Sequence, residues 1–258
     1  MTIWWYRFFK YILIGPFLRV WNRPRTQGLG RIPEEGAVIL ASNHLAVLDS
    51  FYLPLVFRRQ MTFLAKKEYF TGTGFVGAVQ RFFFTVVGQV PIDRTSGDAA
   101  RDALVAGLKV LDGGDVLGMY PEGTRSPDGR LYRGKTGVAR VALASGAKVY
   151  PVGMINTERA NPPNTWRVLP HRIGVRIGEP LDPADYRDRG DEYACARALT
   201  DDLMRALQNL TGQTYVDAYS AEVKAALAAG EGYPAGAEPG GALEAAAPAG
   251  ALRWWRGR

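Results

Sequence analysis

The sequence has 258 residues, of which 47% are hydrophobic and 22% are charged. This length is enough for one α/β domain or two small ones. The composition excludes a wholly disordered chain, a collagen-like repeat and a bare coiled coil. A single cysteine, Cys195, excludes an intramolecular disulfide framework and a multi-cysteine zinc site, and its helical context is typical of a buried structural thiol.

The formal net charge of +7 is concentrated at the two ends of the sequence. Residues 1–33 contain six Lys or Arg and no acid, residues 251–258 add three Arg, and the central part carries −2. Both basic ends are also rich in tryptophan, a combination typical of segments at the surface of an anionic membrane. A nucleic-acid binder more often spreads its basic residues over a folded face. We therefore expect anionic membrane lipids as partners, and no nucleic acid.

The first segment is apolar, but Arg7 and Lys10 lie near its middle and Pro16 interrupts a long helix. Each cation would cost about 2.5–3.5 kcal/mol at the centre of a bilayer on insertion scales. The pattern therefore favours a helix lying in the membrane plane, with both cations on one face, over a membrane span or a cleaved signal peptide. A helix packed on the protein's own core is the alternative. The expected apolar side contains Trp5, Phe8, Phe9 and Ile12.

Strand-like and helix-like patterns alternate downstream. Strands are expected at 37–42, 62–65, 86–92, 115–120, 148–155 and 171–177, and helices near 49–58, 74–83, 97–112 and 134–145. Such alternation predicts an α/β fold with a mixed, partly parallel sheet flanked by helices.

Three regions follow from these patterns. Residues 1–24 form an interfacial helical segment and residues 25–229 form the α/β domain, which ends in a helical pattern from 191 to about 229. Residues 230–258 are dominated by Ala, Gly and Pro and are expected to form a flexible tail with a basic, aromatic end.

The first candidate for chemistry is the pair His44 and Asp49, which follows the first strand. The carboxyl ends of strands are where α/β folds usually place reactive groups. The spacing of His44 and Asp49 suits a histidine on the loop and an aspartate in the first turn of the next helix. The carboxylate would then hold one imidazole nitrogen and leave the other as a base. On these two residues alone, a histidine that merely caps the strand end remains an alternative.

The second candidate is the segment Tyr120–Ser126, which also follows an apolar strand. Gly123 allows close backbone approach, Thr124 offers a hydroxyl, and Arg125 offers a planar guanidinium suited to phosphate. A solvated basic loop is the alternative, but the placement after a buried strand favours a phosphate site. Lys66 and Arg94 follow two further strands, and each alone is typical of a solvated strand end.

Four segments resemble, in order, the four motifs of the glycerolipid acyltransferases, and in particular the 1-acyl-sn-glycerol-3-phosphate acyltransferase type. They are Asn43-His44 with Asp49, Gln89–Arg94, Pro121–Ser126 and Val149–Val152. The resemblance covers roughly residues 25–185, and the order of several motifs makes it more specific than the histidine–aspartate pair.

The resemblance implies transfer of a fatty acyl group from acyl-CoA or acyl carrier protein to the sn-2 hydroxyl of 1-acylglycerol 3-phosphate (lysophosphatidic acid). The product would be phosphatidic acid, a step in phospholipid synthesis. It implies no cofactor beyond the thioester co-substrate and no metal. A peripheral or monotopic enzyme on the cytoplasmic face of the cell membrane is expected.

The resemblance also implies roles for individual residues. His44 would be the base, Asp49 its orienting partner, and Pro151 would shape the acyl or donor side. Substrate binding would fall to Lys66, Arg94, Glu122, Gly123, Thr124 and Arg125, with Arg125 most directly on the phosphate. Acylation of glycerol 3-phosphate or of another lysophospholipid, hydrolysis by the same base, and a non-catalytic basic membrane-binding module are the alternatives.

Overall fold

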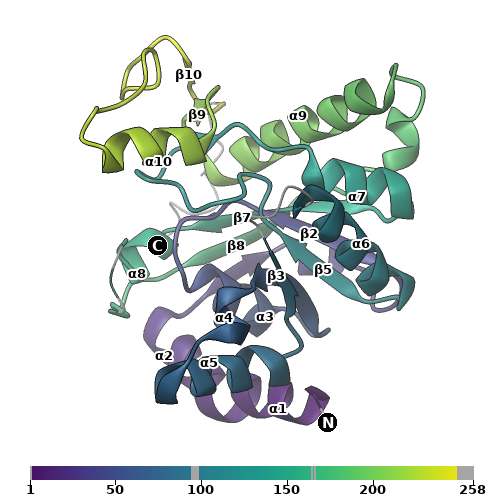
Figure 1. The fold of residues 1–258 in the computed structure, drawn as a ribbon, viewed down its shortest axis with the longest axis vertical. Coiled ribbons are helices and arrows are strands. Elements are labelled where there is room, and N and C mark those ends of the chain that lie inside the picture. Colours follow the sequence, from purple (N-terminus) through teal and green to yellow (C-terminus); the bar gives the residue numbers. More distant parts are fainter. Residues whose placement is uncertain (1, 94–98, 164, 166, 249–258) are drawn as a thin grey trace.

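The computed structural model describes residues 2–93, 99–163, 165 and 167–248, and Figure 1 shows helices arranged around a central sheet. The sheet has seven strands in the order β1-β8-β7-β2-β5-β3-β4. All neighbouring strands are parallel except β7 and β8, which confirms the expected mixed sheet. The strands are β1 (Arg25–Gln27), β2 (Val38–Ser42), β3 (Met61–Lys66), β4 (Val90–Ile92), β5 (Val116–Met119), β7 (Val149–Ile155) and β8 (Gly174–Ile177).

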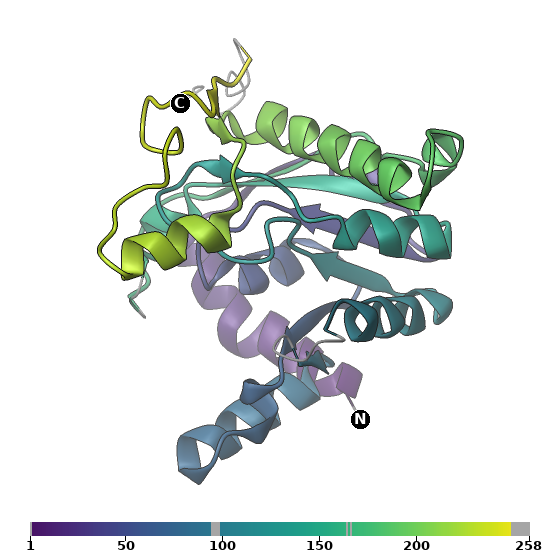
Figure 2. The ribbon, with the colours of Figure 1, turned by 45° about the horizontal axis from the view of Figure 1, so that its top comes forward.

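Helices cover both faces of this sheet, as Figure 2 shows. Val38 and Leu40 of β2 point into a core shared with α2 and α3, whereas Ile39 and Ala41 point into a core shared with α6, α7 and α9. This alternation follows from the two-residue period of a strand, and it explains why β2 is a continuous apolar run. The helices are α2 (Ile14–Asn22), α3 (Asp49–Val56), α6 (Ala99–Asp112), α7 (Gly137–Ser145) and α9 (Glu192–Thr211).

The N-terminal segment folds as α1 (Thr2–Phe8), a π-helical turn η1 (Phe9–Leu13) and α2. It lies beside α5 (Gly74–Val86), which the short helix α4 (Glu68–Thr71) precedes. Edge-to-face ring pairs join the two parts, with centroid distances of 5.3 Å for Trp5–Phe82 and 5.1 Å for Phe9–Phe83. Among the described residues, no helix combines the length and the apolar character that crossing a membrane requires.

Lys10 does not share an exposed face with Arg7, which corrects the expectation from a regular helix. Its side chain is buried, and Nζ donates to the carbonyl of Phe57 at the end of α3. Arg19 Nη2 donates to the carbonyl of Leu55, 3.2 Å away, in the same last turn. Cations are favoured at a helix C-terminus, so α3 fastens the N-terminal helices to the domain. Burial lowers the pKa of Lys10 to about 8.

Two helix boundaries differ from the expected pattern: α5 ends later than hydropathy indicates, and α9 ends earlier. Helix α5 continues to Val86, so β4 is confined to Val90–Ile92. The expected helix from 191 to about 229 is divided at Gly212, whose φ of +71° ends α9 in the left-handed conformation. Strand β9 (Tyr215–Val216) and helix α10 (Ser220–Ala228) follow.

A second, three-stranded sheet lies at the C-terminal end of the described chain. Strand β9 pairs in parallel with β6 (Leu131–Tyr132) and antiparallel with β10 (Glu244–Ala245). The remaining short elements are η2 (Leu29–Arg31), α8 (Thr157–Ala160) and η3 (Pro183–Tyr186).

The described part of the expected tail, residues 230–248, is packed rather than extended. Arg130 Nη1 lies 2.5 Å from Glu244 Oε1, and its Nη2 donates to the carbonyl of Ala237 at 2.8 Å. The ring of Tyr233 lies 5.1 Å from the same guanidinium, and Ala237 is fully buried. Contacts with one arginine outside the segment thus hold it against the domain, and composition alone does not predict these contacts. Residues 249–258, the basic aromatic end, lie outside the described residues.

Candidate active site

The two predicted reactive loops meet at one edge of the sheet. Strands β2 and β5 are parallel neighbours, so the loops that follow them leave from the same side. The backbone N–H of Ser126 donates to the carbonyl of His44 at 2.8 Å. This hydrogen bond joins the histidine loop to the loop that carries Arg125.

Asn43 fixes the start of the histidine loop. Its buried amide donates through Nδ2 to the carbonyl of Met154 at 3.0 Å and accepts from the N–H of the same residue at 2.7 Å. These bonds extend the pairing of β2 with β7 by one residue. The chain therefore leaves the sheet in a defined direction just before His44.

His44 and Asp49 form the predicted pair. His44 Nδ1 lies 2.9 Å from Asp49 Oδ2, and this oxygen also accepts from the backbone N–H groups of Leu45 and Ala46, at 2.7 and 2.9 Å. A carboxylate oxygen can only accept hydrogen bonds, so the ring N–H of His44 is placed at Nδ1, facing Asp49 Oδ2. The other nitrogen, Nε2, has no hydrogen-bond partner in the described chain, and 16% of the His44 side chain is exposed. This arrangement suits a general base.

Tyr120 supports the imidazole from one side. The two rings are stacked, with 3.8 Å between centroids and 10° between planes. The Tyr120 hydroxyl lies 2.8 Å from Ser50 Oγ, next to Asp49 in the first turn of α3. Burial, and then the charge of Asp49, raise the pKa of Tyr120, so its hydroxyl stays protonated. Sequence reasoning assigned no role to Tyr120 or Ser50.

Glu122 is buried between the two loops rather than turned outward. Its carboxyl group accepts from the backbone N–H of Tyr132 at 3.0 Å and from that of His44 at 3.4 Å. Burial raises the pKa of Glu122 to about 8. The side chain is thus placed to hold the loops together, and the contact with a substrate that the resemblance implies stays a prediction.

The residues after Glu122 form the outer part of the site. Gly123 has a φ of +74°, a conformation that favours glycine, and the side chain of Lys135 lies against it. Thr124 and Arg125 are half-buried. Within the described chain, the Arg125 guanidinium forms no hydrogen bond and no ion pair, so it is available to an anion.

Three other predicted residues are not brought to His44 by a described contact. Pro151 is buried inside β7, paired with Ala41 of β2, and its role on the donor side stays a prediction. Lys66 ends β3 at the same edge of the sheet, but only its backbone is described. Arg94 lies outside the described residues.

Comparison with known proteins bears on the same loops. A family model described as "Acyltransferase" matches residues 23–155, just over half of the chain. The chain belongs to this acyltransferase family. The matched residues include His44, Asp49 and Arg125 and every segment on which the resemblance was based. Helices α9 and α10 lie outside the match.

Curated relatives carry names that fit the resemblance. The chain is 30% identical over 172 residues to the chloroplastic 1-acyl-sn-glycerol-3-phosphate acyltransferase LPAT1 of Arabidopsis thaliana, covering 66% of this chain and 46% of the relative. It is 32% identical over 130 residues to a 1-acyl-sn-glycerol-3-phosphate acyltransferase of Borreliella burgdorferi, covering 50% of each. The chain spans about half the length of these relatives.

A solved structure shares the fold. It is the 1-acyl-sn-glycerophosphate (LPA) acyltransferase PlsC of Thermotoga maritima, with a TM-score of 0.58, 23% identity and coverage of 76% of both chains. This agreement confirms the predicted fold class of a mixed sheet flanked by helices.

Proposed function

We propose that this protein is an O-acyltransferase that moves a fatty acyl group from acyl-CoA or acyl carrier protein to the sn-2 hydroxyl of 1-acylglycerol 3-phosphate. One observation carries the proposal. Within the described residues, the His44–Asp49 pair keeps Nε2 without a partner, and a hydrogen bond joins its loop to the loop with the available Arg125 guanidinium. A base beside an anion site fits an acceptor that carries both a hydroxyl and a phosphate. The names of the curated relatives support this acceptor.

The chemistry needs one base. The acceptor hydroxyl gives its proton to His44 Nε2 as its oxygen attacks the thioester carbonyl, and a tetrahedral intermediate forms. When that intermediate collapses, the carbon–sulfur bond breaks and the thiolate takes the proton back from the imidazolium. Asp49 stabilises the imidazolium between the two steps through its hydrogen bond to Nδ1. Because a thiolate is a good leaving group, a separate acid and a serine or cysteine nucleophile are unnecessary.

Arg125 is the proposed anchor of the acceptor phosphate. A guanidinium binds phosphate with two parallel hydrogen bonds, which a lysine ammonium does not reproduce. We expect Arg125→Lys to raise the apparent KM for lysophosphatidic acid by about tenfold and to leave that for acyl-CoA nearly unchanged. A larger effect on acyl-CoA would place the donor at this loop instead.

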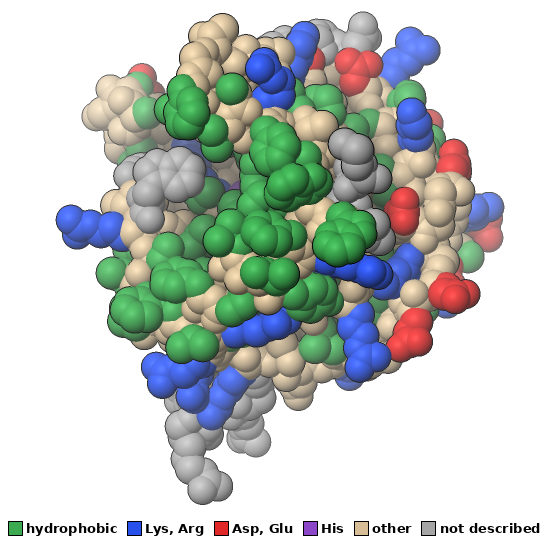
Figure 3. All heavy atoms as spheres, turned by 90° about the horizontal axis from the view of Figure 1, so that it is seen from below, with side chains coloured by type: hydrophobic (Ala, Val, Ile, Leu, Met, Phe, Trp, Pro, Cys, Tyr) green, Lys and Arg blue, Asp and Glu red, His purple; other side chains and the backbone are tan. Residues whose placement is uncertain are grey.

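The proposed enzyme works at an anionic membrane surface, on the cytoplasmic leaflet. Exposed hydrophobic side chains from α1 to α2 and from α4 to α5 gather on one side of the molecule, which we call the apolar face. Figure 3 shows it, with Lys and Arg along part of its border. Such a combination binds anionic bilayers without crossing them. The apolar face includes Trp4, Tyr11, Ile12, Leu13, Phe17, Val20, Trp21, Tyr69, Phe75, Val76, Val79 and Phe82.

The N-terminal helices thus have one face buried against the domain and one face exposed. Tyr6 and Leu18 are buried against the domain, whereas Trp4 and, from the expected apolar side, Ile12 are exposed. Phe9, expected on the membrane side, packs on Phe83 of α5 instead. Helix α5 therefore adds apolar surface that the N-terminal sequence alone did not predict.

An assay with purified protein on anionic vesicles tests the function. Palmitoyl-CoA is supplied with lysophosphatidic acid, glycerol 3-phosphate or water alone, and release of free thiol is measured. We expect turnover with lysophosphatidic acid that His44→Ala lowers by about 10²–10⁴-fold. His171→Ala is the matched control, because it removes the other of the two histidines in the sequence. Thiol release without an acceptor would indicate a hydrolase, and no release with any acceptor a non-catalytic module.

A further inference from the structure

Helix α10 lies directly on the loop that carries Arg125, although it is outside the residues that match the family model. Ser220 Oγ donates to the carbonyl of Arg125 at 3.1 Å. Lys224 Nζ, one turn later, donates to Thr124 Oγ1 at 3.2 Å. These bonds place an ammonium group at the surface of the Thr124–Arg125 segment.

The position of α10 is fixed from both sides. Val223 of α10 packs in a small core with Tyr132 and Val216, and Ala237 closes that core from the C-terminal segment. Arg130 ties this segment down through Glu244. Lys224 therefore approaches the loop from a rigid element, not from a free chain end.

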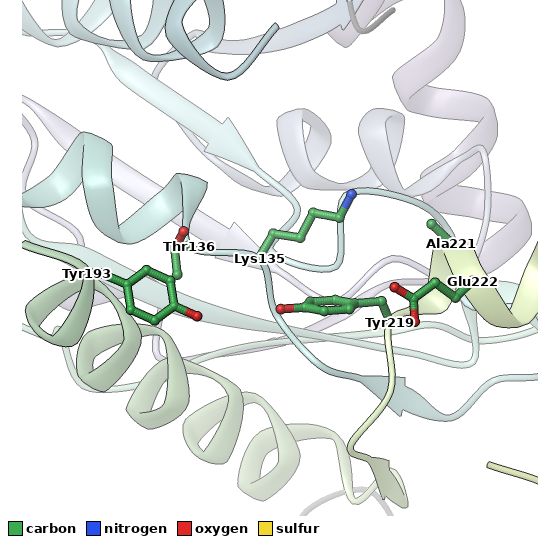
Figure 4. Close-up of a pocket in the computed structure, with 6 residues that line it drawn as sticks. All are labelled: Lys135, Thr136, Tyr193, Tyr219, Ala221 and Glu222. Atoms are coloured by element: carbon green, nitrogen blue, oxygen red, sulfur yellow. The ribbon is translucent and has the colours of Figure 1, made fainter. Parts of the chain in front are cut away.

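A second lysine lies beside the same loop. Lys135, after β6, lies against Gly123: a Cβ at that position would be 3.4 Å from Lys135 Cδ. Figure 4 shows its side chain extending between Thr136 and the start of α10, across a cavity of about 350 Å³. The described chain gives the Lys135 ammonium no ion pair. Glu222 is the one acid among the residues that line this cavity: Lys135, Thr136, Tyr193, Tyr219, Ala221 and Glu222.

We propose that Lys224 is a further binding residue for the acceptor phosphate, acting with Arg125 and supported by Lys135. A phosphate monoester carries about −1.5 to −2 charges at pH 7, so a single guanidinium does not balance it. Three cations around Gly123–Arg125 suit this dianion better than the singly charged phosphodiester of a lysophospholipid headgroup. The inference rests on the proposed function and makes α10 one wall of the acceptor site.

Binding and turnover measured side by side test this assignment. Lys224→Met is compared with Lys109→Met, which removes an exposed lysine from the last turn of α6. We expect Lys224→Met to raise both the Kd and the apparent KM for lysophosphatidic acid about tenfold, with kcat and the KM for acyl-CoA within about twofold. The Kd for monooleoylglycerol, which lacks the phosphate, should not change. Lys109→Met should match the wild type throughout.

Two further variants separate charge from structure. Lys224→Arg keeps a cation and should retain most of the affinity. Ser220→Ala removes the hydrogen bond from α10 to the carbonyl of Arg125 without changing charge. An unchanged Kd for lysophosphatidic acid in Lys224→Met would overturn the inference. So would an equal loss of affinity for monooleoylglycerol, because that result would indicate a merely structural role. A wild-type protein that turns over no lysophosphatidic acid would instead overturn the proposed function.

Discussion

The imidazole of His44 lies flat against the phenol ring of Tyr120, with 3.8 Å between the ring centroids. Tyr120 is stacked in turn on Phe63 of β3, with 5.6 Å between centroids and 12° between planes. Gly118 of β5 makes room for this stack, because a Cβ there would collide with the Phe63 ring. Asp49 holds the imidazole at its edge and Tyr120 at its face, so both the position and the plane of the base are fixed.

Tyr120 is therefore expected to position the base. Tyr120→Leu should lower kcat about tenfold, because an aromatic stack is worth about 0.5–1.5 kcal/mol and the imidazole plane is no longer held. Tyr120→Phe keeps the stack and should change kcat by no more than about threefold. The check is kcat and its pH profile for both variants.

Ser50→Ala provides the control for Tyr120, because it removes the same hydroxyl contact from the other side. It should match Tyr120→Phe. If Tyr120→Leu and Tyr120→Phe lose equal activity, the hydroxyl rather than the ring matters and the positioning role is wrong.

Asp49→Asn should leave a small residue of activity, larger than that of His44→Ala. The amide still accepts a hydrogen bond, but it does not stabilise the imidazolium as a carboxylate does. Single-turnover rates of the two variants at saturating substrate make this comparison. An Asp49→Asn enzyme as active as the wild type would show that Asp49 has no part in the reaction.

Glu122 predicts a pH dependence of stability. In the unfolded chain its carboxyl has a pKa of about 4.5, and in the folded protein burial raises this pKa to about 8. Between these values the folded state keeps a proton that the unfolded state has lost. Its contribution to stability is therefore full below about pH 4.5 and is lost as the pH rises through about 8.

Urea unfolding from about pH 5 to about pH 8 measures this dependence. The free energy of unfolding should fall across the range in the wild type and fall less steeply in Glu122→Gln, which stays neutral. The same slope in both proteins would contradict the raised pKa. Glu122→Ala, which leaves the N–H of Tyr132 without its acceptor, should lose about 1–3 kcal/mol at the lower pH.

The apolar face predicts where vesicle binding can be weakened. Phe75 on α5 is 85% exposed and Trp4 on α1 is 80% exposed. Replacing both with serine should lower affinity for anionic vesicles at least tenfold, since a buried aromatic side chain contributes about 1.5–3 kcal/mol. Vesicle co-sedimentation measures the loss, and thermal denaturation checks that the fold is intact.

Val105→Ser is the matched control for the apolar face, because this side chain is 59% exposed but belongs to α6, outside the helices that form that face. It should bind vesicles as the wild type does. Equal binding by the Phe75 and Trp4 variant would place the membrane contact elsewhere on the protein.

The sequence predicted the parts of the site that depend on strand ends. His44 and Glu122 follow apolar runs as predicted, and the parallel pairing of β2 with β5 brings their loops together. The sequence did not predict the inward turn of Lys10, because hydropathy treats every lysine as solvent-exposed and the carbonyl of Phe57 that receives it is 47 residues away.

The C-terminal region shows the same limit for composition. Residues rich in Ala, Gly and Pro suggest freedom, yet a single guanidinium, Arg130, holds both Ala237 and Glu244. Lys224 reaches Thr124 over a separation of 100 residues. Contacts of this kind depend on the tertiary fold and produce no periodic pattern in the local sequence from which they could be predicted.

Helix α3 begins with Asp49 and its last turn receives Lys10 and Arg19. Its eight residues span only about 12 Å, so one short rigid rod separates the orienting carboxylate from the segment that carries the apolar face. In the proposed enzyme the reaction therefore takes place at the lipid–water boundary. Turnover should then follow the mole fraction of lysolipid within the vesicle surface and fall when inert phospholipid dilutes it, even while the bulk concentration of lysolipid stays constant.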